Sequence, residues 1–502
     1  MKKVMRTKLF LPIVIWFCLF MFVSYRSFAN NIIITNLSLT DQNMSNHYIM
    51  VKFDINWENS WRTYNAPNNW DAAWVFVKYR IGTGTWKHSW LNNSGHINPT
   101  GSTITIGLLD QSIPFNQTTN PGLGAFIYRD SNGIGIFSKS NVQLRWNYGA
   151  NGVADNAVID ICVYAIEMVY VPKGSFSVGS GGTEVGAFYK YPTTTNPFQI
   201  TSEDPIIVGT ENDNLNYSYS TYSGDHLGPI PITFPKGYYA FYCMKYEISQ
   251  QGYVDFLNSL TQAQADARKY TGSSYRYGIN GTTAGSYVTT NPFLACNFLN
   301  WTDIAAYLDW SGLRPMTELE LEKSCRGTLT SVPNEYAWGT TGIANSPYSI
   351  INSGTYTENI ASNYSIIVGN ATFNITTPIN GSINGPVRVG IFAGNELNTG
   401  RITSGATYYG IMEMSGNVWE RSITVGNPEG RSYTGMNGNG VLDISGNADV
   451  LHWPGTSGVG AGFRCGVWVH GFGLQVSDRI NAAHYTSIRY YDSGGRGVRT
   501  AP

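Results

Sequence analysis

The stretch from Gly410 to Ser422 reads G-I-M-E-M-S-G-N-V-W-E-R-S and guides the interpretation of the whole chain. Gly416 and Asn417 predict a turn, because glycine adopts left-handed conformations freely and asparagine tolerates them. Glu420 follows three residues after Asn417. An amide oxygen, a carboxylate and a main-chain oxygen near Val418 could therefore meet at one point, which predicts a Ca²⁺ site. The alternative is a buried turn whose asparagine is satisfied by hydrogen bonds within the protein.

The first 29 residues have the pattern of a secretory signal peptide. Four basic residues within positions 2–8 precede an apolar run over 9–23, and small residues stand at Ser27 and Ala29. This order is typical of a signal cleaved after Ala29. The run is short for a bilayer span, and no later stretch is long and apolar enough to form one. We therefore expect a mature chain without a membrane span that is secreted, periplasmic or at the cell surface.

The composition predicts a folded, loop-rich and β-leaning protein. Of 502 residues, 42% are hydrophobic and only 13% are charged, with 55 glycines and 33 tyrosines. The formal net charge of −1 gives no field that would attract nucleic acid. Five cysteines follow the predicted signal, so at least one has no partner within the chain. None lies in a C-x-x-C pair, which argues against a zinc knuckle; the five are Cys162, Cys243, Cys296, Cys325 and Cys465.

Residues 30–160 predict an antiparallel β-sandwich. Val51, Phe53, Ile55 and Trp57 alternate with polar residues, which is the period of a half-buried strand. Turn-rich segments separate further β-rich runs at 73–80, 102–106, 125–129 and 142–146. Seven tryptophans lie between residues 57 and 146. They could form a carbohydrate-stacking face, but filling the core of a sandwich is the simpler interpretation.

Residues 161–502 predict a second domain with short helices. Ser249 is a predicted cap for one helix, and Thr302 for another that Gly312 would end. Thr317 and Glu320 have the spacing of a capping box at the start of a third. With the strands expected around them, these helices give an α+β fold class for the chain.

Several segments of this region resemble the motifs of one protein family, and they occur in the same order as in that family. They are Glu167–Ser180, Tyr239–Leu260, Leu313–Gly327 (L-R-P-M-T-E-L-E-L-E-K-S-C-R-G), Pro386–Phe392, Gly410–Ser422 and the closing Gly497-Val498-Arg499. Together they resemble the formylglycine-generating enzymes, also called sulfatase-modifying factors, over about two-thirds of the chain. The resemblance implies a variant of the C-type lectin-like fold with little regular structure. It also supports the calcium prediction at Asn417, Val418 and Glu420.

The same resemblance bears on catalysis. Family members that make formylglycine hold copper(I) with two cysteines, five apart, near the C-terminus, and thiolates suit this ion. The corresponding span here, Gly471–Arg479, keeps the family arginine as Arg479 but has no cysteine, and none follows Cys465. Copper is therefore not expected. The iron-dependent branch of the fold is also disfavoured, because the seven histidines show no i, i+3 or i, i+4 pairing. No catalytic residue is predicted, and whether the chain is an enzyme stays open.

The C-terminal loops predict a ligand-binding surface, because similar scaffolds bind ligands there and tyrosine and serine make adaptable contacts. The predicted residues are Trp468, His470, Ser477, Arg479, Tyr485 and Tyr490. They could equally be ordinary residues of an aromatic-rich loop.

The resemblance also suggests a disulfide. Cys325 ends a helix where some family members carry a bridged cysteine, and Cys465 lies beside the C-terminal loop. We therefore predict a Cys325–Cys465 bridge, the alternative being two buried thiols that pack as small apolar groups.

Three functions remain open. The first is an exported module that binds a protein or glycan at the cell surface. The second is an enzyme of the family with divergent oxidase or other chemistry. The third is a structural component of the cell envelope.

Overall fold

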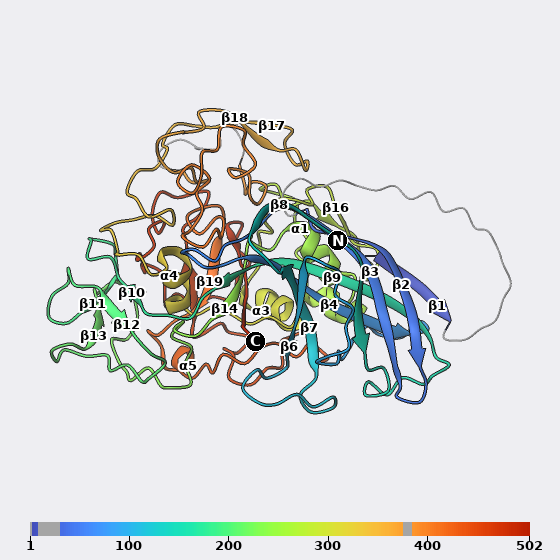
Figure 1. The fold of residues 1–502 in the computed structure, drawn as a ribbon. Helices are drawn as coiled ribbons and strands as arrows, with labels where there is room; N and C mark the ends of the chain where they lie inside the picture. The colour runs from blue at the N-terminus through green and yellow to red at the C-terminus, as the bar shows by residue number, and fades with distance from the viewer. Residues whose placement is uncertain (1–2, 9–30, 375–383) are drawn as a thin grey trace. The chain divides into compact units, whose positions relative to one another are not determined.

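The computed structural model describes residues 3–8, 31–374 and 384–502 (Figure 1). Strands in antiparallel sheets predominate, and the helices of the described residues have ten residues or fewer. The predicted signal cleavage site and the apolar run before it lie outside the described residues. Within the described part of the chain, we find no helix with the length and apolar character needed to cross a membrane.

The chain divides into two compact units, each of which is described by itself. The N-terminal unit comprises residues 1–62, 72–167 and 502, and the C-terminal unit comprises residues 63–71 and 168–501. The division falls within one strand, β9, between Glu167 and Met168. The predicted boundary at residues 160 and 161 stays a prediction.

The N-terminal unit consists of two groups of strands. One is a three-stranded antiparallel sheet in the order β2-β3-β8, and the other has the order β9-β4-β7-β6, with β1 paired to β9 and β5 to β4. The strands are β1 (Lys3–Lys8), β2 (Ile33–Asn43), β3 (Tyr48–Arg62), β4 (Asp71–Ile81), β5 (Lys87–His88), β6 (Ser102–Leu108), β7 (Gly122–Arg129), β8 (Gly133–Trp146) and β9 (Val158–Val171).

The alternation predicted around residue 53 is confirmed in β3. Val51, Phe53, Ile55 and Trp57 are fully buried there, whereas the residues between them are partly exposed. They belong to one apolar core that also contains Trp146. At these positions the tryptophans therefore fill the interior.

The C-terminal unit has short strands joined by long loops. Its sheets are β22-β14 with residues 168–171 of β9, then β20-β19-β21, and four two-stranded pairs, β10-β12, β11-β13, β15-β16 and β17-β18. The strands are β10 (Phe176–Val178), β11 (Phe188–Lys190), β12 (Phe198–Ile200), β13 (Leu215–Tyr217), β14 (Phe241–Met244), β15 (Ile279–Asn280), β16 (Val288–Thr289), β17 (Ser349–Ile351), β18 (Asn359–Ser362), β19 (Trp419–Ile423), β20 (Ala461–Arg464), β21 (Ser493–Gly494) and β22 (Val498–Thr500).

Side-chain caps fix where the helices of this unit begin. The helices are α1 (Gln250–Leu257), α2 (Gln262–Arg268), α3 (Trp301–Trp310), α4 (Glu318–Arg326) and α5 (Pro428–Arg431). Ser249 caps α1, and Thr317 with Glu320 forms the predicted capping box of α4. The predicted cap of α3 is wrong by two positions. Asn300, not Thr302, caps this helix, because its side chain accepts from the Asp303 backbone N–H.

Candidate functional site

The turn at Gly416 and Asn417 has the predicted backbone conformation. Gly416 and Asn417 both have positive φ, at 101° and 69°. The amide of Asn417 is held on both sides: its oxygen accepts from the Val387 N–H at 2.9 Å, and its nitrogen donates to Glu247 at 2.5 Å. The Val418 N–H donates to the other oxygen of Glu247 at 3.1 Å.

Glu420 faces a different partner from Asn417. Its carboxylate lies 2.6 Å from the guanidinium of Arg496, and both side chains are fully buried. Over residues 3–8, 31–374 and 384–502, no group of three or more His, Cys, Asp or Glu side chains is arranged to hold a metal ion. Calcium binding at Asn417, Val418 and Glu420 stays a prediction, and the structure gives these residues protein partners.

Three buried carboxyls, of Glu247, Glu413 and Glu420, interact with one another beside Arg496. Burial raises the pKa of all three, and the pKa of Glu413 rises to about 7. The charge of Glu413 raises the pKa of Glu247 further, whereas Arg496 lowers the pKa of each carboxyl. Like charges in a dry interior cannot all ionise easily, so this cluster holds a proton more tightly than separate carboxyls would.

Aromatic side chains gather around Trp468, one of the predicted ligand residues. Tyr275 stacks on Tyr491 with ring centroids 4.6 Å apart, and each ring lies 5.7 Å from Trp468. Tyr490 packs against the same apolar cluster. Tyr275, Tyr490 and Tyr491 are partly exposed, whereas Trp468 is 3% exposed. We call these four residues the aromatic face.

Trp468 carries an unsatisfied donor within the aromatic face. Its indole N–H is buried and meets no hydrogen-bond acceptor among the described residues. A buried donor without a partner costs about 1–3 kcal/mol. A ligand oxygen that reached this N–H would remove that cost.

The other predicted ligand residues separate into two groups. Tyr485 is 52% exposed, and His470 is partly exposed and stacks on Phe472 at 4.6 Å. Ser477 and Arg479, in contrast, are fully buried. Ligand contact by these two stays a prediction, and the structure places neither of them at the surface.

Arg479 and Ser477 instead anchor the C-terminal loop to helix α4. Arg479 pairs with Glu318 at 2.6 Å, and its guanidinium lies over the ring of Phe188. The Ser477 hydroxyl donates to Glu322 and accepts from Arg326. Their polar side chains indicated exposure in the sequence, but buried partners satisfy them here.

Helix α4 is the centre of this buried ion network. Arg464 contacts both Glu318 and Glu322, at 3.0 and 3.4 Å. Burial would raise the pKa of Glu318, but Arg479 and Arg464 together hold it below its usual value. Nothing local to residues 318–326 indicates these distant partners, so the ion network was not predicted.

The predicted Cys325–Cys465 disulfide is wrong. Both residues are buried free thiols, and so are the other three cysteines of the described chain. Burial raises the pKa of both thiols, so they stay protonated. Cys465 has a φ of 77°, in the left-handed region, and its carbonyl accepts from the Gly416 N–H. The two cysteines pack as small apolar groups, which was the alternative interpretation.

A family comparison covers the part of the chain that holds α1 to α4 and the Gly410–Ser422 stretch. Residues 233–465 match the sulfatase-modifying factor enzyme 1-like domain. The chain contains this domain. No curated protein matches the sequence.

Two parts of the C-terminal unit lie outside the matched segment. The sulfatase-modifying factor domain ends its match at residue 465, so Trp468, Tyr490 and Tyr491 of the aromatic face follow it. Residues 168–232, with strands β10 to β13, precede it. The match therefore confirms the family resemblance and assigns no role to either flanking part.

Proposed function

We propose that the protein is an exported binding module that takes a protein or glycan ligand at the aromatic face. The observation that carries this proposal is the buried indole N–H of Trp468, which has no acceptor among the described residues. Partly exposed tyrosines surround it and offer flat, rigid contact surfaces. An aromatic platform with one unsatisfied donor fits a ligand that has both an apolar face and a hydrogen-bond acceptor.

The cysteines support binding rather than formylglycine formation. The span Gly471–Arg479 has no cysteine, and Cys325 and Cys465, which precede it, are buried with raised pKa values. Copper(I) is held by thiolates, which a buried thiol with a raised pKa does not supply. We therefore propose that the copper-binding pair of the formylglycine-forming enzymes is missing here.

We also propose an antiparallel sandwich for residues 30–160 and a variant of the C-type lectin-like fold for residues 161–502. The alternating burial along β3 supports the first proposal. Short strands joined by long loops are consistent with the second. Secretion, or a place in the periplasm or at the cell surface, rests on the signal-like pattern of the first 29 residues.

A glycan and peptide array probed with the full-length protein tests the binding role. We expect captured ligands to be lost in Trp468→Phe, which keeps a ring but removes the N–H, and in Tyr491→Ala. Tyr219→Ala is the matched control, because Tyr219 is 82% exposed and outside the aromatic face. Ligands that all three variants retain would contradict this site.

A second experiment separates binding from catalysis by the same domain. The protein is incubated with a cysteine-containing peptide of sulfatase type, and the peptide is analysed by mass spectrometry. We expect the thiol to persist. An aldehyde that forms only when the protein is present would favour the alternative, an enzyme of divergent chemistry.

A further inference from the structure

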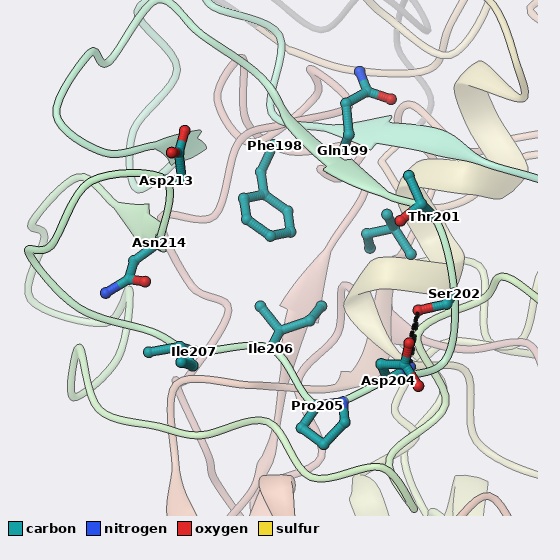
Figure 2. A pocket seen from close by; sticks show the side chains of 11 residues that line it. Phe198, Gln199, Thr201, Ser202, Asp204, Pro205, Ile206, Ile207, Asp213 and Asn214 are labelled. Atoms are coloured by element: carbon teal, nitrogen blue, oxygen red, sulfur yellow. Dashed lines mark hydrogen bonds between the residues drawn. The ribbon is translucent and has the colours of Figure 1, made fainter.

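A cavity of about 270 Å³ lies in the segment before the matched domain (Figure 2). Its walls come from β12 and from the loops that follow, over residues 198–202, 204–207 and 213–214. No residue of the aromatic face lines it. The family match begins at residue 233, so it assigns nothing to this cavity.

One wall of the cavity is an aromatic ring that packs against the apolar cluster of this segment. Figure 2 shows the ring of Phe198 pointing into the cavity, with Ile206 opposite it. Ile206 is 8% exposed, and Phe198 packs against the same apolar cluster. The backbone of Ile206 exchanges two hydrogen bonds with Ile230, at 3.0 and 2.8 Å. The ring is therefore a supported surface and not a loose side chain.

The rim of the cavity is polar and carries amides. The Gln199 side chain points away from the ring of Phe198, and its nitrogen donates to the Ser177 hydroxyl at 2.5 Å. Asn214 is fixed by its backbone, whose N–H donates to Glu211 and whose carbonyl accepts from Tyr191. These contacts fix the backbone at Asn214 before any ligand arrives, which reduces the entropy lost on binding.

Two carboxylates at the rim are already engaged. Asp213 pairs with Lys190 at 2.9 Å, so its charge is compensated. Asp204 accepts from the Ser202 hydroxyl at 2.8 Å. Both keep further lone pairs, because an ionised carboxylate offers about four acceptor sites. The rim thus offers acceptors to hydroxyl groups without the strong negative field that would select a cation.

The cavity has an apolar ring on one side and polar groups around it, namely an amide and two carboxylates. This division matches one class of ligand. We propose that this cavity binds a neutral pyranose sugar, with the C–H face of the sugar on Phe198 and its hydroxyls bonded to Asn214, Asp204 and Asp213. A pyranose presents C–H groups on its face and hydroxyls around its edge, which is the same division. The cavity is near the lower end of small-ligand sites, which suits one sugar ring. This site is additional to the aromatic face and does not depend on it.

Saturation-transfer NMR on the full-length protein tests the proposal. The probes are the methyl glycosides of glucose, galactose, mannose and N-acetylglucosamine at millimolar concentration. We expect transfer to at least one of them, strongest at ring C–H protons. Phe198→Ala should weaken the affinity by about tenfold or more, equivalent to about 1.4 kcal/mol. Absence of transfer to all four glycosides would overturn the proposal.

Variants on the rim keep the test decisive if Phe198→Ala does not fold. Asn214→Ala removes a rim amide, and we expect it to weaken binding several-fold. Asn212→Ala is the matched control, because Asn212 is exposed and does not line the cavity. Binding that Asn214→Ala leaves unchanged but Tyr491→Ala removes would place the sugar on the aromatic face and overturn this site.

Discussion

The two units of the molecule fill their interiors with different chemistry. In the N-terminal unit the largest fully buried side chains are aromatic, namely Trp57, Trp74, Trp146 and Tyr79. In the C-terminal unit most are arginines: Arg326, Arg421, Arg464, Arg479, Arg496 and Arg499, with Trp301 and Trp338. Strand length also differs between the two units. Strand β3 has 15 residues, whereas those wholly within the C-terminal unit have five or fewer.

The buried arginines satisfy backbone carbonyls that no sheet reaches. Arg479 donates to the carbonyls of Gly186 and Ser223, and Arg496 donates to that of Met412. A long strand pairs its own carbonyls in the ladder, but a loop leaves them to other donors. Five donors on one guanidinium can serve several loops at once. Buried charge in the C-terminal unit therefore replaces the hydrogen bonds that regular strands supply in the N-terminal unit.

Removing the centre of the ion network should have the largest effect. Glu318→Ala leaves Arg464 and Arg479 buried without this shared partner. Breaking a buried pair in this way costs about 3–5 kcal/mol. Urea denaturation of the full-length protein should show this loss of unfolding free energy. Asp266→Asn, at an exposed pair with Lys269, should leave it nearly unchanged. Equal effects of the two variants would contradict the role given to the buried ion network.

A cavity in the N-terminal core should have the next largest effect. Leu144 lies in β8 and is fully buried, so Leu144→Ala should cost about 3 kcal/mol. The loss should be independent of salt, because no charge is involved. Ile134→Ala is the matched control on the same strand, where Ile134 is 87% exposed. A strongly salt-dependent loss in Leu144→Ala would refute the apolar account of this unit.

The buried carboxyl cluster should make the stability of the C-terminal unit depend on pH, with a smaller effect than the two changes above. The pKa of Glu413 rises from 4.5 to about 7 on burial, so the folded state binds this proton more tightly than the unfolded state. Its contribution to stability is present at low pH and is lost as the pH rises from about 4.5 through about 7. Glu413→Gln keeps an acceptor for the Gly390 N–H and removes the titration.

We therefore expect Glu413→Gln to gain about 2–3 kcal/mol relative to wild type between pH 5 and pH 8, since one unit of pKa corresponds to about 1.4 kcal/mol. Urea denaturation at the two pH values measures this change. Glu396→Gln, at an exposed position, is the control. If Glu413→Gln keeps the pH dependence of wild type, another group is responsible.

Local features of the fold were predictable from the sequence. The turn at Gly416 and Asn417, the capping box of Thr317 with Glu320 and the alternation in β3 each depend on residues close in the chain. Their physical cause acts over a few positions, so a short window contains the whole signal.

Features of the candidate site that depend on distant residues were not predictable. Arg479 reads as a surface residue because its partner, Glu318, lies 161 positions away. Asn417 reads as a cation ligand because its partner, Glu247, lies 170 positions away. The cavity beside Phe198 was not predictable either, since it forms only when residues 198–214 fold back on themselves. Trp468 was predicted in the ligand site, but nothing in its neighbourhood indicates an unsatisfied N–H.

The ion network of helix α4 delays the folding of the C-terminal unit during synthesis. Glu318 leaves the ribosome 146 residues before Arg464 and 161 before Arg479. At ordinary translation rates that interval is on the order of ten seconds. During this time the carboxylate that belongs in the dry interior has neither arginine, whereas all strands of the N-terminal unit have already been made. A chain truncated before residue 464 would keep a foldable N-terminal unit and a C-terminal unit that cannot close.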